Sequence, residues 1–171
     1  MPRLHGYTKK ALIELYTKMV TARRSDEKMM ILLRQGKAFF LTSCAGHEVA
    51  QLAAAQNIKP GVDWSYVYYR DAAFVLGLGT TSREHLLSFL AKKDDPDSGG
   101  RQFPYHFSRK DLRIVSPSSA TGMQYLHAVG AGLAIKWEKS REVVYVSSGE
   151  GTTSQGDFHE ALNWASREKL P

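Results

Sequence analysis

The last stretch of the chain, Val143 to Pro171, constrains the fold more than any other. Its first four residues are β-branched or aromatic, which is typical of a strand buried on both faces, as in a parallel sheet. A Gly-Glu-Gly turn at residues 149–151 follows, and the spacing of Ser154 and Asp157 predicts a capping box at the start of a helix. Strand, tight turn and helix in this order predict an α/β fold with a mostly parallel sheet and helices on both faces.

The same turn is suited to holding an anion. Gly149 and Gly151 let backbone N–H groups approach a ligand closely, and a helix N-terminus adds partial positive charge. Glu150 then predicts a bridging cation, because Mg²⁺ takes a carboxylate on one side and phosphate oxygens on the other. By itself, a glycine-rich turn between a strand and a helix is more often plain turn chemistry, and that alternative stays open at this point.

Hydrophobic periodicity and turn signals predict the remaining elements of a single domain, residues 1–171. The chain opens with a long helix at residues 8–35, in which Leu12, Leu15 and Met19 recur at helical steps. An irregular span at 92–113 is rich in Asp, Pro and Gly, and spans of that length are usually functional or mobile. The other predicted segments are helices at 46–57, 72–78, 81–90 and 123–139, a strand at 64–69 and a small-residue loop at 116–122.

Three further features indicate ligand contacts, and each has an ordinary alternative. Arg70 follows the predicted strand 64–69, at the end where open α/β sheets bind ligands, and its guanidinium can pair with two phosphate oxygens. A surface pair with Asp71 explains Arg70 equally well. His106 can meet an anionic substrate, or it can be structural or merely exposed. The hydroxyl-bearing loop 116–122 suits close approach of a flat heterocycle, and it equally suits an ordinary loop.

Charge and cysteine content narrow the class of protein. The chain has 23 Lys and Arg against 17 Asp and Glu, a net charge of +6, but the basic residues are scattered. This pattern favours a surface that attracts anionic ligands over a nucleic-acid interface. Cys44 is the sole cysteine, which excludes an internal disulfide and fits a reducing compartment. Residues 1–10 lack a signal-peptide core, and no apolar run approaches the ~18 residues of a membrane span. We therefore expect a cytoplasmic protein.

Longer strings of residues are much more specific than the Gly-Glu-Gly turn. The segment GEGTTSQGDFHEALNWA resembles the first part of the thiamin diphosphate motif in α subunits, or α regions of fused chains, of 2-oxo acid dehydrogenase E1 components. The segments YYRDA, GGRQFPYHF and LYTKMVTARRSDEKMMILLRQGKAFF resemble the same family. Glu150 in place of the commoner Asp is similar to the branched-chain members. The family motif closes with an Asn after one further strand, and the sequence stops at Pro171 before it.

The resemblance implies a thiamin diphosphate-binding fold that is incomplete at its C-terminus, as in a fragment of a longer protein. It implies thiamin diphosphate and Mg²⁺ as cofactors, and oxidative decarboxylation of a 2-oxo acid with acyl transfer to the lipoyl group of an E2 component. An E1 β subunit or a fused β region would complete the site within an oligomer. Two alternatives remain: a truncated, cofactor-incompetent assembly module of the same fold, and a pyruvate- or acetoin-type thiamin enzyme.

The resemblance also assigns roles to individual residues. Tyr69 and Arg70 match the dipeptide that holds the diphosphate, and Glu150 matches the Mg²⁺ ligand. His106 lies in the segment that matches the loop approaching the active site, where it would be the catalytic histidine. Gln124 matches a position in a monovalent-cation site, although Met123 stands where a Thr ligand is usual. The other implied cofactor contacts are Ser119, Thr121, Gly149, Gly151 and Thr152.

Overall fold

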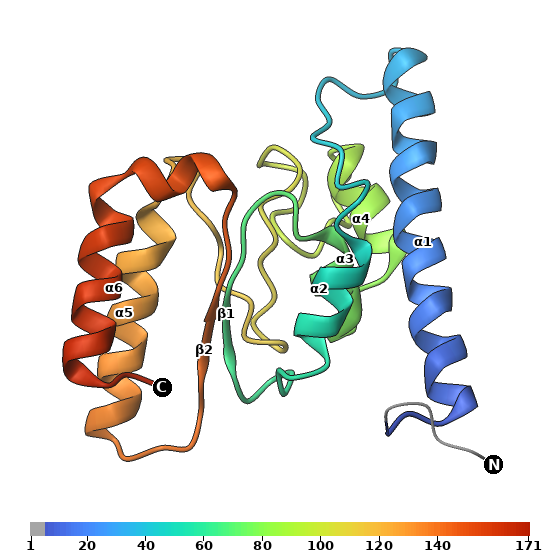
Figure 1. Ribbon diagram of the computed structural model, residues 1–171. Coiled ribbons are helices and arrows are strands. Elements are labelled where there is room, and N and C mark those ends of the chain that lie inside the picture. The colour runs from blue at the N-terminus through green and yellow to red at the C-terminus, as the bar shows by residue number, and fades with distance from the viewer. Residues whose placement is uncertain (1–5) are drawn as a thin grey trace.

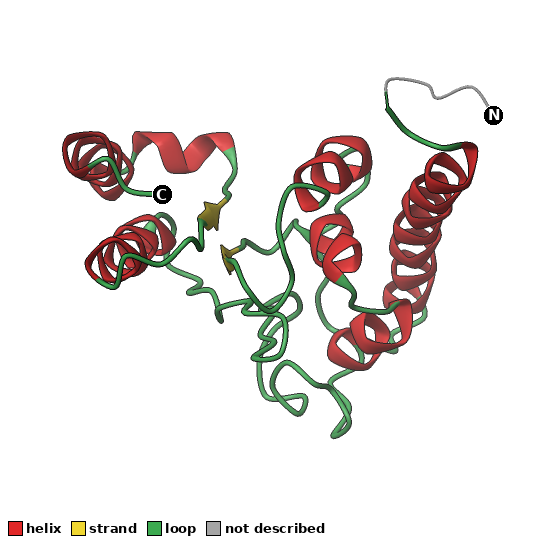
Figure 2. Cartoon of the chain, turned by 90° about the horizontal axis from the view of Figure 1, so that it is seen from below, coloured by secondary structure: helices red, strands yellow, loops and turns green. Residues whose placement is uncertain are grey.

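A computed structural model describes residues 6–171 of the chain (Figure 1). Two short parallel strands, β1 (Trp64–Tyr66) and β2 (Val144–Val146), pair in register from Trp64 with Val144 to Tyr66 with Val146. Helices lie on both sides of this pair, as the view from below shows (Figure 2). The predicted α/β class and the parallel pairing are therefore confirmed.

Six α-helices and one 3-10 helix complete the described chain. On one side of the strands lie the long N-terminal helix α1 and three shorter helices, and α5 and α6 lie side by side on the other (Figure 1). No helix within residues 6–171 is both long enough and apolar enough to span a membrane. The bounds are α1 Lys9–Arg34, α2 Glu48–Ala55, α3 Ala72–Leu78, α4 Ser82–Phe89, α5 Met123–Trp137, the 3-10 helix η1 Glu150–Ser154 and α6 Gly156–Glu168.

The predicted helices are confirmed with small shifts at their ends, and Thr81 caps the start of α4. The Glu84 amide donates to Thr81 Oγ1 (3.2 Å) while the Thr81 amide donates to Glu84 Oε2 (2.7 Å), which is a complete capping box. The strand predicted at 64–69 ends at Tyr66, because the chain turns at Tyr68, whose carbonyl accepts from the Asp71 amide at 3.1 Å.

The capping box predicted for Ser154 and Asp157 is wrong. Residues 150–154 wind instead into η1, and α6 begins two residues later with Gln155 at its N-cap position and no side-chain cap. Ser154 is therefore the last residue of η1 and does not cap α6. The 3-10 turn is closed at its start by the Thr152 amide, which donates to the Gly149 carbonyl at 3.1 Å. A tighter turn directly after β2 overrides the local cap signal.

Strand β2 is less buried than its sequence predicts. Val144, Tyr145 and Val146 are all only partly buried, although a strand covered on both faces was expected. β2 pairs with β1 on one edge, and among residues 6–171 no second strand flanks the other edge, where the Val144 amide donates to the Pro171 carbonyl at 3.3 Å. Helix α5 is also only partly covered, because Ala128 and Gly132 are buried while Ala134 is exposed.

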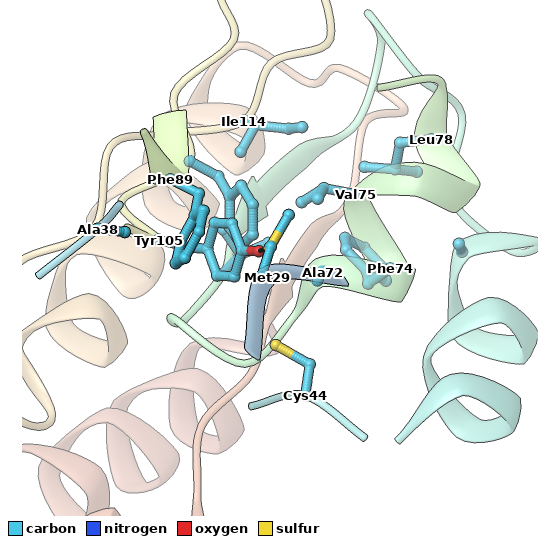
Figure 3. Close-up of a cluster of buried hydrophobic side chains, with 13 residues drawn as sticks. Met29, Ala38, Cys44, Ala72, Phe74, Val75, Leu78, Phe89, Tyr105 and Ile114 are labelled. Carbon is cyan, nitrogen blue, oxygen red and sulfur yellow. Dashed lines mark hydrogen bonds between the residues drawn. The ribbon is translucent and has the colours of Figure 1, made fainter. Parts of the chain in front are cut away.

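The main core lies between β1 and the helices α1 to α4 (Figure 3). Phe74 and Val75 from α3 and Met29 from α1 are fully buried there. The irregular span 92–113 has neither helix nor strand, as predicted, yet it contributes Tyr105 and Phe107, whose rings stack at 4.9 Å. These two side chains anchor the span, so its course is fixed at the place where it approaches the carboxyl ends of the strands.

Candidate functional site

A polar cavity of about 440 Å³ opens at the carboxyl ends of β1 and β2. Open α/β sheets bind ligands at this end, because the loops from neighbouring strands diverge there. The cavity is built from the turn after β1, the turn after β2 and the loop before α5. Its lining residues are His47, Tyr68, Tyr69, Arg70, Ser118, Ser119, Ala120, Thr121, Gln124, Gly149, Glu150, Gly151, Thr152 and Gln155. The structure thus brings together every residue predicted to contact the cofactor or a cation, and leaves His106 just outside.

Arg70 is held at the cavity wall by neutral groups. Its Nη1 donates to the Ser43 carbonyl at 2.6 Å, and its guanidinium carbon lies 5.4 Å from the centroid of the Tyr69 ring. The alternative surface pair with Asp71 is wrong, because no ion pair joins these two side chains and Asp71 is buried in other contacts. Since one nitrogen is occupied and the positive charge is unpaired within residues 6–171, Arg70 is suited to bind an anion in the cavity.

Glu150 stands at the start of η1 with an exposed side chain. Within the described chain its carboxylate forms neither an ion pair nor a hydrogen bond, although its carbonyl accepts from Thr153 Oγ1 at 2.7 Å. The cavity therefore carries one unpaired positive side chain and one unpaired negative side chain. A Mg²⁺-bound diphosphate would complement both side chains, because Glu150 could supply a carboxylate ligand to the metal and Arg70 could bind the phosphate oxygens.

The glycines of the 149–151 turn leave room for a ligand. A methyl group built on Gly151 would meet nothing within 4 Å, and one built on Gly149 would lie 3.8 Å from the Tyr68 ring. Crowding by the chain itself therefore does not require glycine at either position. Gly122 is different, because its φ is +99° and a Cβ there would lie 3.2 Å from Gln155. The bare backbone at 149–151 thus fits a group that approaches the N–H groups closely.

The loop before α5 supplies the opposite wall. His106 Nδ1 lies 2.7 Å from the Phe103 carbonyl, so in the neutral ring Nδ1 donates and Nε2 accepts from Ser119 Oγ at 2.6 Å. This hydrogen bond ties the predicted catalytic histidine to a predicted cofactor contact. Gln124 is buried, and its Nε2 donates to the Ser147 carbonyl at 3.1 Å, so its amide oxygen is the atom suited to a cation.

A second, more apolar cavity of about 330 Å³ adjoins the first. The two share Tyr69 and Ser119, and His106 lines only the second. Phe40 and Phe103 form its apolar wall, with ring centroids 5.6 Å apart in an edge-on arrangement. Sequence reasoning gave no reason to pair these two phenylalanines, because they lie in separate loops far apart along the chain. In the structure both are exposed to solvent. The full lining is Phe40, Thr42, Tyr69, Phe103, Pro104, His106 and Ser119.

Three supporting residues behind the cavity were also missed. Asp71 is 1% exposed and accepts from the Tyr68 amide (3.1 Å), from Gln51 Nε2 (3.1 Å) and from the Ser147 hydroxyl. Burial raises the pKa of Asp71 to about 6, while the hydrogen bonds from Ser147 and from the Tyr68 amide oppose that rise. Only the position of Asp71 directly after Arg70 hinted at a role, and Gln51 carried no signal in the sequence.

A family model and individual known proteins both relate this chain to 2-oxo acid dehydrogenase E1 components. The model of the dehydrogenase E1 component family matches residues 16–171. A 2-oxoisovalerate dehydrogenase subunit alpha of Bacillus subtilis is 45% identical over 97% of this chain and 50% of its own length. A mitochondrial 2-oxoisovalerate dehydrogenase subunit alpha 2 of Arabidopsis thaliana is 31% identical over 93% and 33%. A pyruvate dehydrogenase E1 component subunit alpha of Staphylococcus aureus is 32% identical over 96% and 41%. The chain spans half or less of the length of these relatives.

Proposed function

This chain belongs to the dehydrogenase E1 component family, and we propose that it forms the α half of a thiamin diphosphate-dependent active site. The reaction is the oxidative decarboxylation of a branched-chain 2-oxo acid, with acyl transfer to the lipoyl group of E2. The observation that carries this proposal is the polar cavity lined by Arg70 and by the turn Gly149-Glu150-Gly151, in which neither Arg70 nor Glu150 forms an ion pair within the described chain. The similarity to 2-oxoisovalerate dehydrogenase α subunits supports the choice of substrate.

In this proposal, different residues of the cavity contact different parts of the cofactor. Arg70 and Tyr69 bind the diphosphate, and Glu150 holds Mg²⁺ against it. The backbone of Gly151 and Thr152 would lie beside the phosphate groups, while Ser119 and Thr121, which line the same cavity, would contact the heterocycle. When bound, thiamin diphosphate supplies the electron sink for decarboxylation. The protein's task is to bind it, orient it and neutralise its charge.

His106 handles protons at the border of the two cavities. Its Nε2 accepts a hydrogen bond from Ser119 Oγ at 2.6 Å, and the Phe103 carbonyl fixes the tautomer by accepting from Nδ1. A histidine fixed in this way can exchange a proton at Nε2 with a substrate oxygen, as general acid–base catalysis requires. The adjoining apolar cavity, with Phe40 and Phe103, suits the branched side chain of the 2-oxo acid.

The proposal extends to partners and setting. Completion of the site falls to an E1 β subunit or a fused β region, and the assembly is an oligomer that acts with a lipoyl-bearing E2. The "subunit alpha" in the names of the relatives supports the α assignment. Gln124 is proposed as a monovalent-cation contact. A cytoplasmic location rests on the single cysteine, Cys44, and the sequence pattern alone.

Calorimetric titration of the chain tests the central part of this function. Thiamin diphosphate is added with Mg²⁺ and, separately, with EDTA, and unphosphorylated thiamin serves as the control ligand. We expect saturable binding only when both Mg²⁺ and the diphosphate are present, because Glu150 reaches the ligand through the metal. Equal binding of thiamin and thiamin diphosphate, or no binding of either, would contradict the proposal; no binding would favour a cofactor-incompetent assembly module.

A further inference from the structure

Two buried carboxylates fasten the strand pair, one at each end. Asp63 is 3% exposed and accepts from the Lys59 amide (2.7 Å) and, across the pair, from the Val143 amide just before β2 (3.1 Å). Asp71 is 1% exposed and accepts from the Tyr68 amide (3.1 Å) and, across the pair, from the Ser147 hydroxyl just after β2. The two residues do the same structural work at opposite ends, but only Asp71 lies behind the cavity.

The contacts of Asp71 reach both halves of the proposed cofactor site. On the β1 side it binds the amide of Tyr68, two residues before Arg70. On the β2 side it binds Ser147, which stands three residues before Glu150. Gln51 of α2 reinforces the first turn, because its Nε2 donates to the Arg70 carbonyl (2.8 Å) as well as to Asp71 (3.1 Å). One carboxylate thus links the backbone that carries the guanidinium to the backbone that carries the metal ligand.

The residue that Asp71 contacts on the β2 side, Ser147, is itself held in place by further hydrogen bonds. The Ser147 amide donates to the Tyr66 carbonyl at 3.1 Å, and the Ser147 carbonyl accepts from Gln124 at 3.1 Å, so Ser147 has little freedom to move. Within residues 6–171 no basic side chain forms an ion pair with Asp71. A buried carboxylate without a counter-ion is costly, and hydrogen bonds of this kind are what make it tolerable. The presence of a buried, unpaired carboxylate at this position is explained if the acceptor oxygens of Asp71 set the geometry of the site.

We propose that Asp71 is a positioning residue that fixes the separation of Arg70 and Glu150 before any ligand arrives. The proposal rests on the function proposed above for these two residues. Asp71 itself touches neither the cavity ligand nor the metal. It acts by holding the Tyr68 turn and Ser147 together, so that the anion-binding and metal-binding groups are preorganised, which is how supporting residues raise affinity.

The test compares Asp71→Asn with Asp63→Asn. Asp71 accepts both strand contacts at Oδ2 and the Gln51 contact at Oδ1, whereas Asp63 uses a different oxygen for each of its two contacts. An Asn side chain has one acceptor oxygen and no charge, so each variant loses at least one contact and weakens those that remain, with little change in volume. In the ligand-free protein, the amides that close the two turns are those of residue 71, which donates to the Tyr68 carbonyl, and of Thr152, which donates to the Gly149 carbonyl. Hydrogen exchange at these two amides is expected to rise at least tenfold in Asp71→Asn only. Affinity for Mg²⁺ and thiamin diphosphate is expected to fall by about 10–100-fold, the usual range for an outer supporting partner. Asp63→Asn should lower the melting temperature by a similar amount and leave both site readouts unchanged.

Ser147 provides an independent check should Asp71→Asn fold poorly. Ser147→Ala removes the hydroxyl that reaches Asp71, whereas Ser147→Thr retains one. We expect the alanine variant to reproduce the faster exchange at the amides of residues 71 and 152 and the threonine variant to restore the wild-type rate. The double variant Asp71→Asn with Ser147→Ala should be no worse than either single variant, because both break the same link.

Two results would overturn the positioning role. One is wild-type exchange at the amides of residues 71 and 152 in both Asp71→Asn and Ser147→Ala. The other is an equal effect of Asp63→Asn on the site, which would mean that any loss of stability loosens it. If the wild-type chain fails to bind thiamin diphosphate, the proposed function fails, but the exchange rates in the absence of ligand still decide whether Asp71 fixes the two turns.

Discussion

The two ends of the strand pair β1–β2 differ in whether their charged side chains are paired within the chain. At the amino end, Glu142 accepts from Trp64 Nε1 (3.0 Å) and pairs with Arg113 (2.8 Å). The Arg113 guanidinium also lies 4.8 Å from the centroid of the Trp64 ring and donates to the Val62 carbonyl at 2.6 Å. The charges of Glu142 and Arg113 are thus both paired within the chain itself.

At the carboxyl end, Arg70 and Glu150 line one polar cavity and, within residues 6–171, neither forms an ion pair. Both ends share the same strands and a buried aspartate, so the difference is not one of architecture. It teaches that a folded chain satisfies its charges where they serve stability and leaves them unpaired where a ligand is to supply the partner. Substitutions at the carboxyl end should therefore affect binding, and substitutions at the amino end should affect stability.

The largest effect is expected from Glu150→Ala. Loss of the proposed metal ligand should weaken Mg²⁺-dependent binding of thiamin diphosphate by about 100-fold or more, because loss of a mere outer partner already costs about 10–100-fold. Glu160→Ala, which removes an exposed carboxylate of α6, is the matched control and should bind normally. Calorimetry gives both affinities, and unchanged affinity in Glu150→Ala would sink the metal assignment.

Arg70→Ala should follow with a loss of about 10–100-fold in affinity for thiamin diphosphate. A hydrogen bond to a charged group contributes about 1.5–3 kcal/mol, and the guanidinium is the cationic side chain that lines this cavity. The melting temperature should change little, since Arg70 makes no ion pair in the described chain. Arg83→Ala, an exposed arginine of α4, serves as the control. Equal affinities of the two variants would remove Arg70 from the site.

Arg113→Ala should show the reverse behaviour. It leaves Glu142 without its ion-pair partner and uncovers the Trp64 ring, so we expect the free energy of unfolding to fall by about 1–2 kcal/mol. Denaturant unfolding measures this loss, and affinity for thiamin diphosphate should stay at the wild-type value. A clear loss of affinity in this variant would break the division between the two ends.

His85 allows a smaller, pH-dependent test of the stability region. This side chain lies 5.5 Å from the Phe107 ring and within 2.8 Å of Thr80 Oγ1, and burial lowers its pKa to about 4. Because the unfolded chain takes up this proton near the ordinary value of 6.5 and the folded chain does not, the contribution is fully present above pH 6.5 and is lost as the pH falls toward 4.

The variant His85→Gln isolates that contribution. The stability advantage of the wild type over the variant should shrink by about 1.4 kcal/mol for each pH unit below 6.5, as urea unfolding at several pH values would measure. The raised pKa values of Asp71 and Asp97, each about 6, act in the opposite direction, but they are common to both proteins and cancel in the difference. An advantage that does not vary with pH would show that burial does not lower the pKa of His85 below its value in the unfolded chain.

Local patterns in the sequence were enough to predict the parts of the fold and site that depend on neighbouring residues. The helices follow from hydrophobic periodicity. Arg70 and the turn 149–151 follow from short motifs at the ends of two predicted strands, whereas Tyr69, Ser119, Thr121 and Gln124 were assigned through the resemblance to the family. The capping box at Ser154 failed because a 3-10 turn competes for the same residues. The full burial of β2 failed because burial depends on what packs against a strand, which the pattern of its own side chains does not reveal.

What the sequence did not reveal depends on contacts between distant segments. The link from Gln51 to Asp71 and on to Ser147 joins three elements that only the fold brings together. The apolar cavity between Phe40 and Phe103 likewise needs two loops to meet. Neither arrangement has a period or a spacing along the chain that reasoning from sequence could use.

A crystal structure of the chain grown with Mg²⁺ and thiamin diphosphate tests the central claim most directly. The account predicts the diphosphate in the polar cavity, within hydrogen-bonding distance of the Arg70 guanidinium. It also predicts Mg²⁺ about 2.1 Å from a carboxylate oxygen of Glu150, the distance typical for this ion. A ligand bound elsewhere, or a metal in the cavity that Glu150 does not touch, would contradict the claim that these charges are left unpaired for the cofactor.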